Sequence, residues 1–145
     1  MVRHARFVAI LAAPLLLGAS PSGTSTLKGV YTEDQAQAGA QLYATRCAMC
    51  HGRLLEGTFE TPGLQNRFIV NWSKAPLSEL YDYLGRAMPQ FAPGSLKPDE
   101  NAKIVAYLLK ANAQPAGAKP LPADTAALKR ILLEPVSAKA ALKAK

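Results

Sequence analysis

Both cysteines of this 145-residue chain lie in one short stretch, RCAMCHG, which spans residues 46–52. His51 follows the second cysteine directly. Residues three and four positions apart lie on the same face of a helix, so a helical turn here would place Cys50 and His51 beside Cys47. A disulfide between these cysteines would close a loop too short to stabilise the fold appreciably. The clustering of both cysteines beside a histidine therefore indicates that these side chains bind or react with something.

The first residues are typical of a secretory signal peptide. A basic start is followed by an apolar run over residues 7–17 and by small residues at 18–20. A bilayer-spanning helix needs about 20 apolar residues, so a membrane anchor is the weaker interpretation. We predict a signal peptide over residues 1–20, cleaved near 19–23, and hence a periplasmic location.

Three kinds of chemistry fit the pattern Cys-x-x-Cys-His. A structural zinc site needs about four protein ligands, and once His4 leaves with the signal peptide only Cys47, Cys50 and His51 remain. A redox dithiol of this spacing is typical of a βαβ context, which the chain lacks. The third possibility is covalent attachment of haem c, in which two thiols add to the two vinyl groups and the histidine binds iron. The sequence favours one haem c, bound through Cys47 and Cys50.

The second iron ligand follows by elimination. The predicted mature chain has no histidine besides His51, and Met49 lies inside the attachment turn. Met88 remains, directly before Pro89 in a loop rich in proline and glycine. Although a methionine is often only a core residue, a thioether is a common haem ligand. We predict His51 and Met88 as the two metal ligands.

Helical periodicity predicts three main helices, over residues 33–46, 76–87 and 98–112. Thr32 is a candidate N-cap of the first, with Gln35 completing a capping box. Residues 52–74 read as loop with room for one short helical turn, and residues 89–97 read as loop. A last helical turn is expected within residues 125–133. The fold class is all-α with long loops.

The domain organisation is simple. We expect a flexible spacer over residues 21–31, one domain over residues 32–133, and a basic, disordered tail over residues 134–145. Residues 20–128 hold ten basic and nine acidic residues, so the net charge of +7 belongs to the chain ends. A nearly neutral domain argues against binding nucleic acid. Only the basic tail offers a contact for a membrane or an acidic partner.

Several stretches together resemble the class I monohaem cytochromes c: YTEDQAQAGAQLYATRCAMCHG, MPQFAPGSL, IVAYLLKAN and PAGAKPLP. They are most similar to the small periplasmic cytochromes that accompany quinoprotein (PQQ) dehydrogenases. The resemblance implies three main helices and long loops wrapped around one haem. It also implies that the first and last helices cross, with Gly39 and Tyr43 facing Tyr107 and Leu108.

The resemblance adds two further cofactor-binding residues. The carbonyl of Pro62 would bond the second ring nitrogen of the histidine ligand, and Trp72 would bond a haem propionate. The alternatives are that Pro62 is a turn proline and that Trp72 is a core residue. The wall of the haem pocket is expected to include five apolar side chains: Leu64, Phe68, Ile69, Phe91 and Leu96.

These predictions lead to a function. With His51 and Met88 on the iron, no position is open for substrate, so we expect an electron carrier and no enzyme. It would accept single electrons from a periplasmic dehydrogenase and donate them to a terminal oxidase or another acceptor. It would act as a monomer or as a subunit of a dehydrogenase complex. The alternative is a five-coordinate haem protein that binds small ligands or peroxide.

Overall fold

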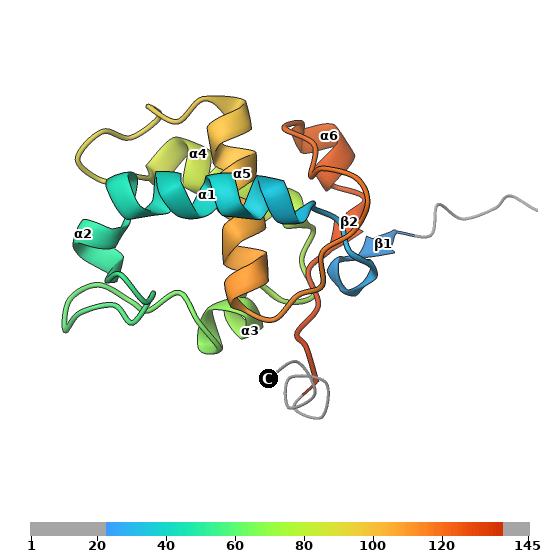
Figure 1. Cartoon of the computed structure of the whole chain (residues 1–145), viewed down its shortest axis with the longest axis horizontal. Helices are drawn as coiled ribbons and strands as arrows, with labels where there is room; N and C mark the ends of the chain where they lie inside the picture. The colour runs from blue at the N-terminus through green and yellow to red at the C-terminus, as the bar shows by residue number, and fades with distance from the viewer. Residues whose placement is uncertain (1–22, 138–145) are drawn as a thin grey trace, which may run out of the picture.

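The structure, a computed structural model, describes residues 23–137, so the predicted signal peptide lies outside the described residues. The three predicted main helices are present as α1, α4 and α5 (Figure 1). The helices are α1 (Glu33–Arg46), α2 (Ala48–His51), α3 (Arg67–Trp72), α4 (Leu77–Ala87), α5 (Pro98–Ala111) and α6 (Thr125–Leu128). The other elements are strand β1 (Thr24–Ser25), a 3₁₀ helix (Thr26–Lys28) and strand β2 (Ile131–Leu132). No helix within residues 23–137 is long and apolar enough to cross a bilayer.

Helix α1 begins as predicted, but its capping box is incomplete. The Thr32 hydroxyl oxygen accepts a hydrogen bond from the Gln35 backbone nitrogen at 3.2 Å. The Gln35 side chain does not return to Thr32. Its Nε2 donates to the Leu121 carbonyl at 2.9 Å, and its Oε1 accepts from the Leu121 nitrogen at 2.7 Å. Gln35 therefore ties α1 to the C-terminal part of the chain.

Helices α1 and α5 cross at a glycine, as the resemblance implied. A Cβ atom on Gly39 would collide with the backbone carbonyl of Lys103, so only glycine allows this separation of the helices. The rings of Tyr43 and Tyr107 pack beside the crossing, with centroids 5.2 Å apart and planes tilted by 50°. Figure 1 shows α1 lying across α5.

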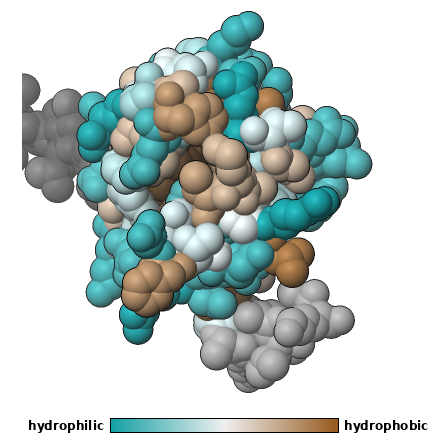
Figure 2. Space-filling view, turned by 90° about the vertical axis from the view of Figure 1, so that its left-hand side faces the viewer, coloured by the Kyte–Doolittle hydropathy of each residue, from teal (hydrophilic) through white to brown (hydrophobic). Residues whose placement is uncertain are grey.

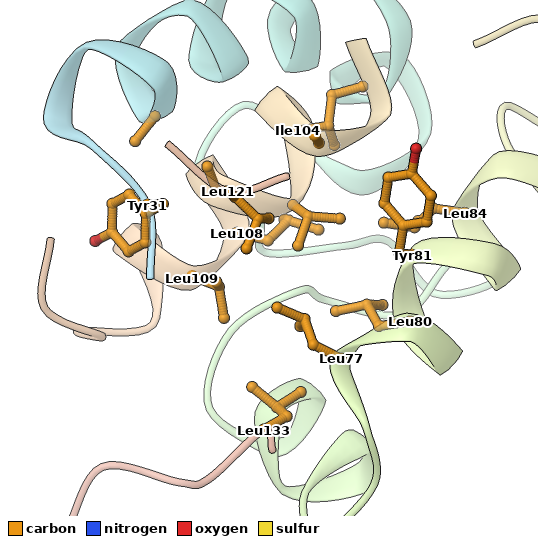
Figure 3. Close-up of a cluster of buried hydrophobic side chains, with 14 of the residues drawn as sticks. Tyr31, Leu77, Leu80, Tyr81, Leu84, Ile104, Leu108, Leu109, Leu121 and Leu133 are labelled. Atoms are coloured by element: carbon orange, nitrogen blue, oxygen red, sulfur yellow. The ribbon is translucent and has the colours of Figure 1, made fainter. Parts of the chain in front are cut away.

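The hydrophobic core lies between α4 and α5 and extends to the C-terminal segment (Figure 3). Leu77 and Leu80 of α4 are buried, as are Leu108 and Leu109 of α5. Leu133, far along the chain, is buried against the same cluster. Each such leucine contributes about 1.5–3 kcal/mol of transfer free energy. This packing holds α4 in place, and with it the start of the loop that follows Ala87.

The predicted last helical turn is present as α6, whereas part of the predicted spacer is ordered. Residues 23–31 are not a loose spacer, because β1 pairs in parallel with β2 and the Thr24 nitrogen donates to the Arg130 carbonyl at 2.8 Å. Helix α6 ends at Leu128, since the residues after it form β2. Pairing gives the backbone groups of both segments partners, which short-range periodicity could not reveal.

The C-terminal segment is fixed to the body by backbone bonds. The Lys74 nitrogen donates to the Leu133 carbonyl at 2.9 Å, and the Leu133 nitrogen donates to the Ala75 carbonyl at 3.1 Å. The tail predicted from residue 134 is anchored at its start, because the Glu134 nitrogen donates to the Thr26 hydroxyl at 3.2 Å. The rest of that predicted tail, from residue 138, lies outside the described residues.

The burial of Tyr31 leads us to expect that the folded state is less stable at alkaline pH. It is 1% exposed and its hydroxyl donates to the Gln114 carbonyl at 2.6 Å. Burial, helped by the charge of Glu33, raises the pKa of Tyr31 from 10.0 to about 12. The neutral phenol stabilises the folded state fully below pH 10, and this contribution is lost as the pH rises through 12.

We expect the free energy of unfolding to fall between pH 10 and pH 12, and to fall less in Tyr31→Phe. Urea unfolding at pH 9, 10, 11 and 12 measures both curves. Parallel curves for the two proteins would show that Tyr31 does not carry the effect.

Candidate functional site

The Cys-x-x-Cys-His stretch forms the helical turn that the sequence predicts. The Cys47 carbonyl accepts hydrogen bonds from the nitrogens of Cys50 and His51 at 3.1 and 2.9 Å. No disulfide joins the two cysteines. Gly52 ends the turn with a φ of 79°, a conformation that glycine adopts without strain. Its carbonyl accepts a hydrogen bond from the Tyr43 hydroxyl at 2.7 Å, so α1 and the turn are held together.

The imidazole of His51 is held by the contact that the resemblance implied. Nδ1 of His51 and the carbonyl oxygen of Pro62 are 2.9 Å apart. A carbonyl oxygen can only accept, so Nδ1 carries the proton and Nε2 keeps its lone pair. This is the arrangement of a metal-binding histidine, whose other nitrogen is fixed by a carbonyl.

A cavity of about 500 Å³ lies against this turn. Its size falls within the range of about 300–1,000 Å³ that is usual for ligand sites. Figure 2 shows the face toward which α2 points, where apolar residues surround a hollow. All the predicted site residues line the cavity: Cys47, Cys50, His51, Pro62, Trp72 and Met88.

Met88 reaches the cavity from a different part of the chain. It follows the last residue of α4, and its backbone nitrogen donates to the Leu84 carbonyl at 3.0 Å. The side chain is half-buried. The cavity thus brings together two thiols, an imidazole with an available Nε2, and a thioether. These groups fit the cofactor that the sequence predicts, a haem c with two covalent bonds and two axial ligands.

Comparison with known proteins identifies the family. The family model described as "Cytochrome C oxidase, cbb3-type, subunit III" matches residues 34–108, which is half of the chain. The chain belongs to this cytochrome c family. The predicted fold class is therefore correct, and the family implies haem c as the cofactor and electron transfer as the activity. The narrower similarity to quinoprotein-associated cytochromes is not part of this match.

The cytochrome is also similar to one solved structure, "Crystal Structure of the Sulfane Dehydrogenase SoxCD from Paracoccus pantotrophus". The two chains share 23% sequence identity with a TM-score of 0.49. The match covers 74% of this chain and 62% of that one. The cytochrome thus spans less than two thirds of the chain it matches.

The apolar wall of the cavity differs in part from the predicted one. Leu64, Phe68 and Phe91 line the cavity as expected. Ile69 and Leu96 belong to the hydrophobic core but do not line the cavity. Their places are taken by core-facing side chains of the long helices: Leu80, Leu84, Ile104 and Leu108. The apolar stripes of α4 and α5 are the signal that could have identified these residues.

Trp72 stands in the cavity wall in contact with a second aromatic residue. The Trp72 and Tyr83 rings have centroids 5.4 Å apart and are tilted by 46°. The Arg86 guanidinium lies 5.4 Å from the Tyr83 ring centroid, within the range of a cation–π contact. This packing fixes the indole at the cavity. Its hydrogen bond to a propionate stays a prediction.

Two arginines that the sequence analysis did not single out also line the cavity. Arg46 precedes the first cysteine, and Arg67 begins α3. Both residues add a positive charge to the wall of the cavity. The position of Arg46 beside the motif was visible in the sequence, whereas Arg67 is brought here only by the fold.

Cys47 is partly buried in the wall of the cavity. Burial, opposed in part by Arg46, raises the pKa of the Cys47 thiol to about 11. Burial therefore favours an uncharged form of this sulfur. Within residues 23–137, no three His, Cys, Asp or Glu side chains are grouped so that they could hold a metal ion. That is the arrangement that the zinc alternative requires.

Proposed function

We propose that this cytochrome carries single electrons between a periplasmic dehydrogenase and a terminal oxidase or another acceptor. One observation carries the proposal: a single cavity is lined by Cys47, Cys50, His51 and Met88. A carrier needs both of its iron ligands to come from the protein, and His51 and Met88 would supply them. The proposal assigns no substrate-binding position to the iron.

Each of these residues has a defined part in the proposal. When bound, haem c supplies an iron that gains or loses one electron. Cys47 and Cys50 would hold the cofactor covalently, and His51 Nε2 and the Met88 sulfur would bind the metal. Pro62 keeps the imidazole oriented through the 2.9 Å bond to Nδ1. The thioether and the apolar wall both disfavour additional positive charge, which favours a high reduction potential.

Electron exchange with a partner requires access to the cofactor. Cys50 is exposed, and three large apolar side chains in nearby segments are also exposed: Met49, Leu54 and Phe91. Phe91 lines the cavity as well. We assign the transient contact with a redox partner to this face, which is the one seen in Figure 2. Such contacts are usually small.

The proposed partners and location rest on different observations. The family is named after a subunit of an oxidase, which supports an oxidase as electron acceptor. A dehydrogenase as donor is supported by the resemblance to the quinoprotein-associated cytochromes. The periplasmic location rests on the signal peptide predicted over residues 1–20. The cytochrome would work alone or as a subunit of the dehydrogenase complex.

The test is production of the full chain in cells that mature c-type cytochromes. We expect wild-type protein to retain haem on a denaturing gel, because thioether bonds survive unfolding. The double variant Cys47→Ser/Cys50→Ser should lose all covalently bound haem. Met49→Ser is the matched control, since Met49 lies between the cysteines and is 77% exposed, and it should keep the haem. A colourless wild-type protein would disprove the proposed function.

A further inference from the structure

Asn112 makes a contact that its place in the sequence did not predict. It is the C-cap of α5, where the sequence indicates only the end of a helix. Its side-chain Nδ2 donates to the Leu108 carbonyl at 2.8 Å and to the Leu64 carbonyl at 2.9 Å. The first bond caps the helix. The second reaches across to the loop that carries Pro62.

That loop is held at both sides of Leu64. The Leu64 nitrogen donates to the Leu55 carbonyl at 2.8 Å, while the Leu64 carbonyl accepts from Asn112. Leu64 is 9% exposed, and its bond with the half-buried Asn112 is partly shielded from water. The Pro62 carbonyl that contacts His51 lies only two residues before this fixed point.

Gly63 joins Leu64 to Pro62 and lies where the backbone of the loop is tightly packed. A Cβ atom on Gly63 would lie 2.9 Å from the Glu56 carbonyl oxygen and 3.1 Å from the Leu55 carbonyl oxygen. The two arms of the loop are therefore in close backbone contact at this residue. A shift of Leu64 cannot be absorbed there, and it would move the Pro62 carbonyl.

The side-chain amide of Asn112 makes hydrogen bonds through its nitrogen but none through its oxygen. Its Oδ1 is buried and has no hydrogen-bond partner among the described residues. A buried acceptor without a partner costs about 1–3 kcal/mol. Ending a helix does not require an amide with this cost, because backbone groups or water can bond the last carbonyls, and the Asn112 backbone nitrogen already donates to the Leu108 carbonyl. The bond to Leu64 supplies a reason for the amide.

We infer that Asn112 is a positioning residue for His51: it fixes the Pro62 carbonyl, and that carbonyl fixes the imidazole. The inference rests on the proposed function, because it takes His51 as an iron ligand. Losing the bond from Asn112 would loosen the contact between Pro62 and Nδ1. A less firmly bonded imidazole is a weaker base, so it stabilises ferric iron less.

The chain offers a matched control in Asn101. This residue also lies on α5 and is buried, and its Nδ2 donates to a backbone carbonyl, that of Tyr81, at 2.8 Å. Its Oδ1 likewise has no partner among the described residues. Asn101→Leu and Asn112→Leu therefore remove similar groups from one helix. Only the second removes a bond to the loop that carries Pro62.

The experiment uses the haem-loaded protein and two readouts. NMR of the reduced form measures solvent exchange of the His51 Nδ1 proton, and electrochemistry measures the reduction potential. We expect Asn112→Leu to exchange this proton about tenfold faster and to have a higher potential. Asn101→Leu should match the wild type in both, although both variants lose stability.

Equal exchange rates and potentials in the two variants would overturn the inference. If Asn112→Leu does not fold, Asn112→Ser replaces it, because a hydroxyl can still cap α5 but is too short to bond Leu64. Wild-type exchange in Asn112→Ser would overturn the inference equally. A failure of the proposed function would give a different result from a failure of this inference. The wild-type protein itself would then lack haem or would lack His51 as a ligand.

Discussion

Met88→Ala is expected to turn the electron carrier into a protein that binds carbon monoxide rapidly. In the proposed function the Met88 sulfur would bind the iron, and alanine cannot replace it. The absorption band from sulfur to ferric iron should disappear, and the potential should fall because a thioether ligand raises it. Truncating this half-buried side chain should also cost about 2 kcal/mol of folding free energy.

Optical spectra of both oxidation states, with and without carbon monoxide, measure the result. Met49→Ala is the control, because it removes an exposed methionine from the attachment turn and should leave the spectra unchanged. Rapid carbon monoxide binding by the wild-type protein would contradict the carrier assignment. It would favour the alternative of a five-coordinate haem that binds small ligands.

Gly39→Ala is expected to lower the free energy of unfolding by about 3 kcal/mol, despite the higher helix propensity of alanine. The added methyl group would collide with the Lys103 carbonyl, which is a backbone atom of α5. Relief requires α1 and α5 to separate. Their separation would also disturb the packing of Tyr43 against Tyr107. Urea unfolding monitored by circular dichroism measures the change.

Gly85→Ala in α4 is the matched control for this substitution. Its added methyl group would lie 3.0 Å from one atom, the Asn101 side-chain nitrogen. A side chain can shift where a backbone cannot, and alanine stabilises a helix by about 0.5–1 kcal/mol over glycine. We expect a stability within about 1 kcal/mol of the wild type. Similar losses in the two variants would show that the helix crossing tolerates a methyl group at Gly39.

The local parts of the fold were predictable because their causes are local. Helical periodicity located α1, α4 and α5, and the turn that holds the cysteines follows from their spacing. Bringing Met88 to the same cavity as His51 required the chemistry of the cofactor, which limited the choice of soft ligands. The contact between Pro62 and His51 came from the family resemblance alone. Its position, eleven residues from the histidine, has no short-range signal.

The other parts of the fold depend on contacts between segments that are distant in the sequence. The pairing of Thr24 with Ile131 was not predictable, because two-residue strands have no periodicity. Ile69 and Leu96 are as apolar as the residues of the cavity wall, and composition alone could not exclude them from it. The bond from Asn112 to Leu64 could not be predicted either, because it forms only once α5 is packed against the loop.

The pairing of β1 with β2 determines how this cytochrome can be attached to something else. In Figure 1 the two strands lie at the opposite end of the molecule from α2 and its cysteines. A tether joined before Gly23 would therefore leave from the end of the protein opposite α2. Such a tether would leave free the face that the proposed function assigns to contact with a redox partner.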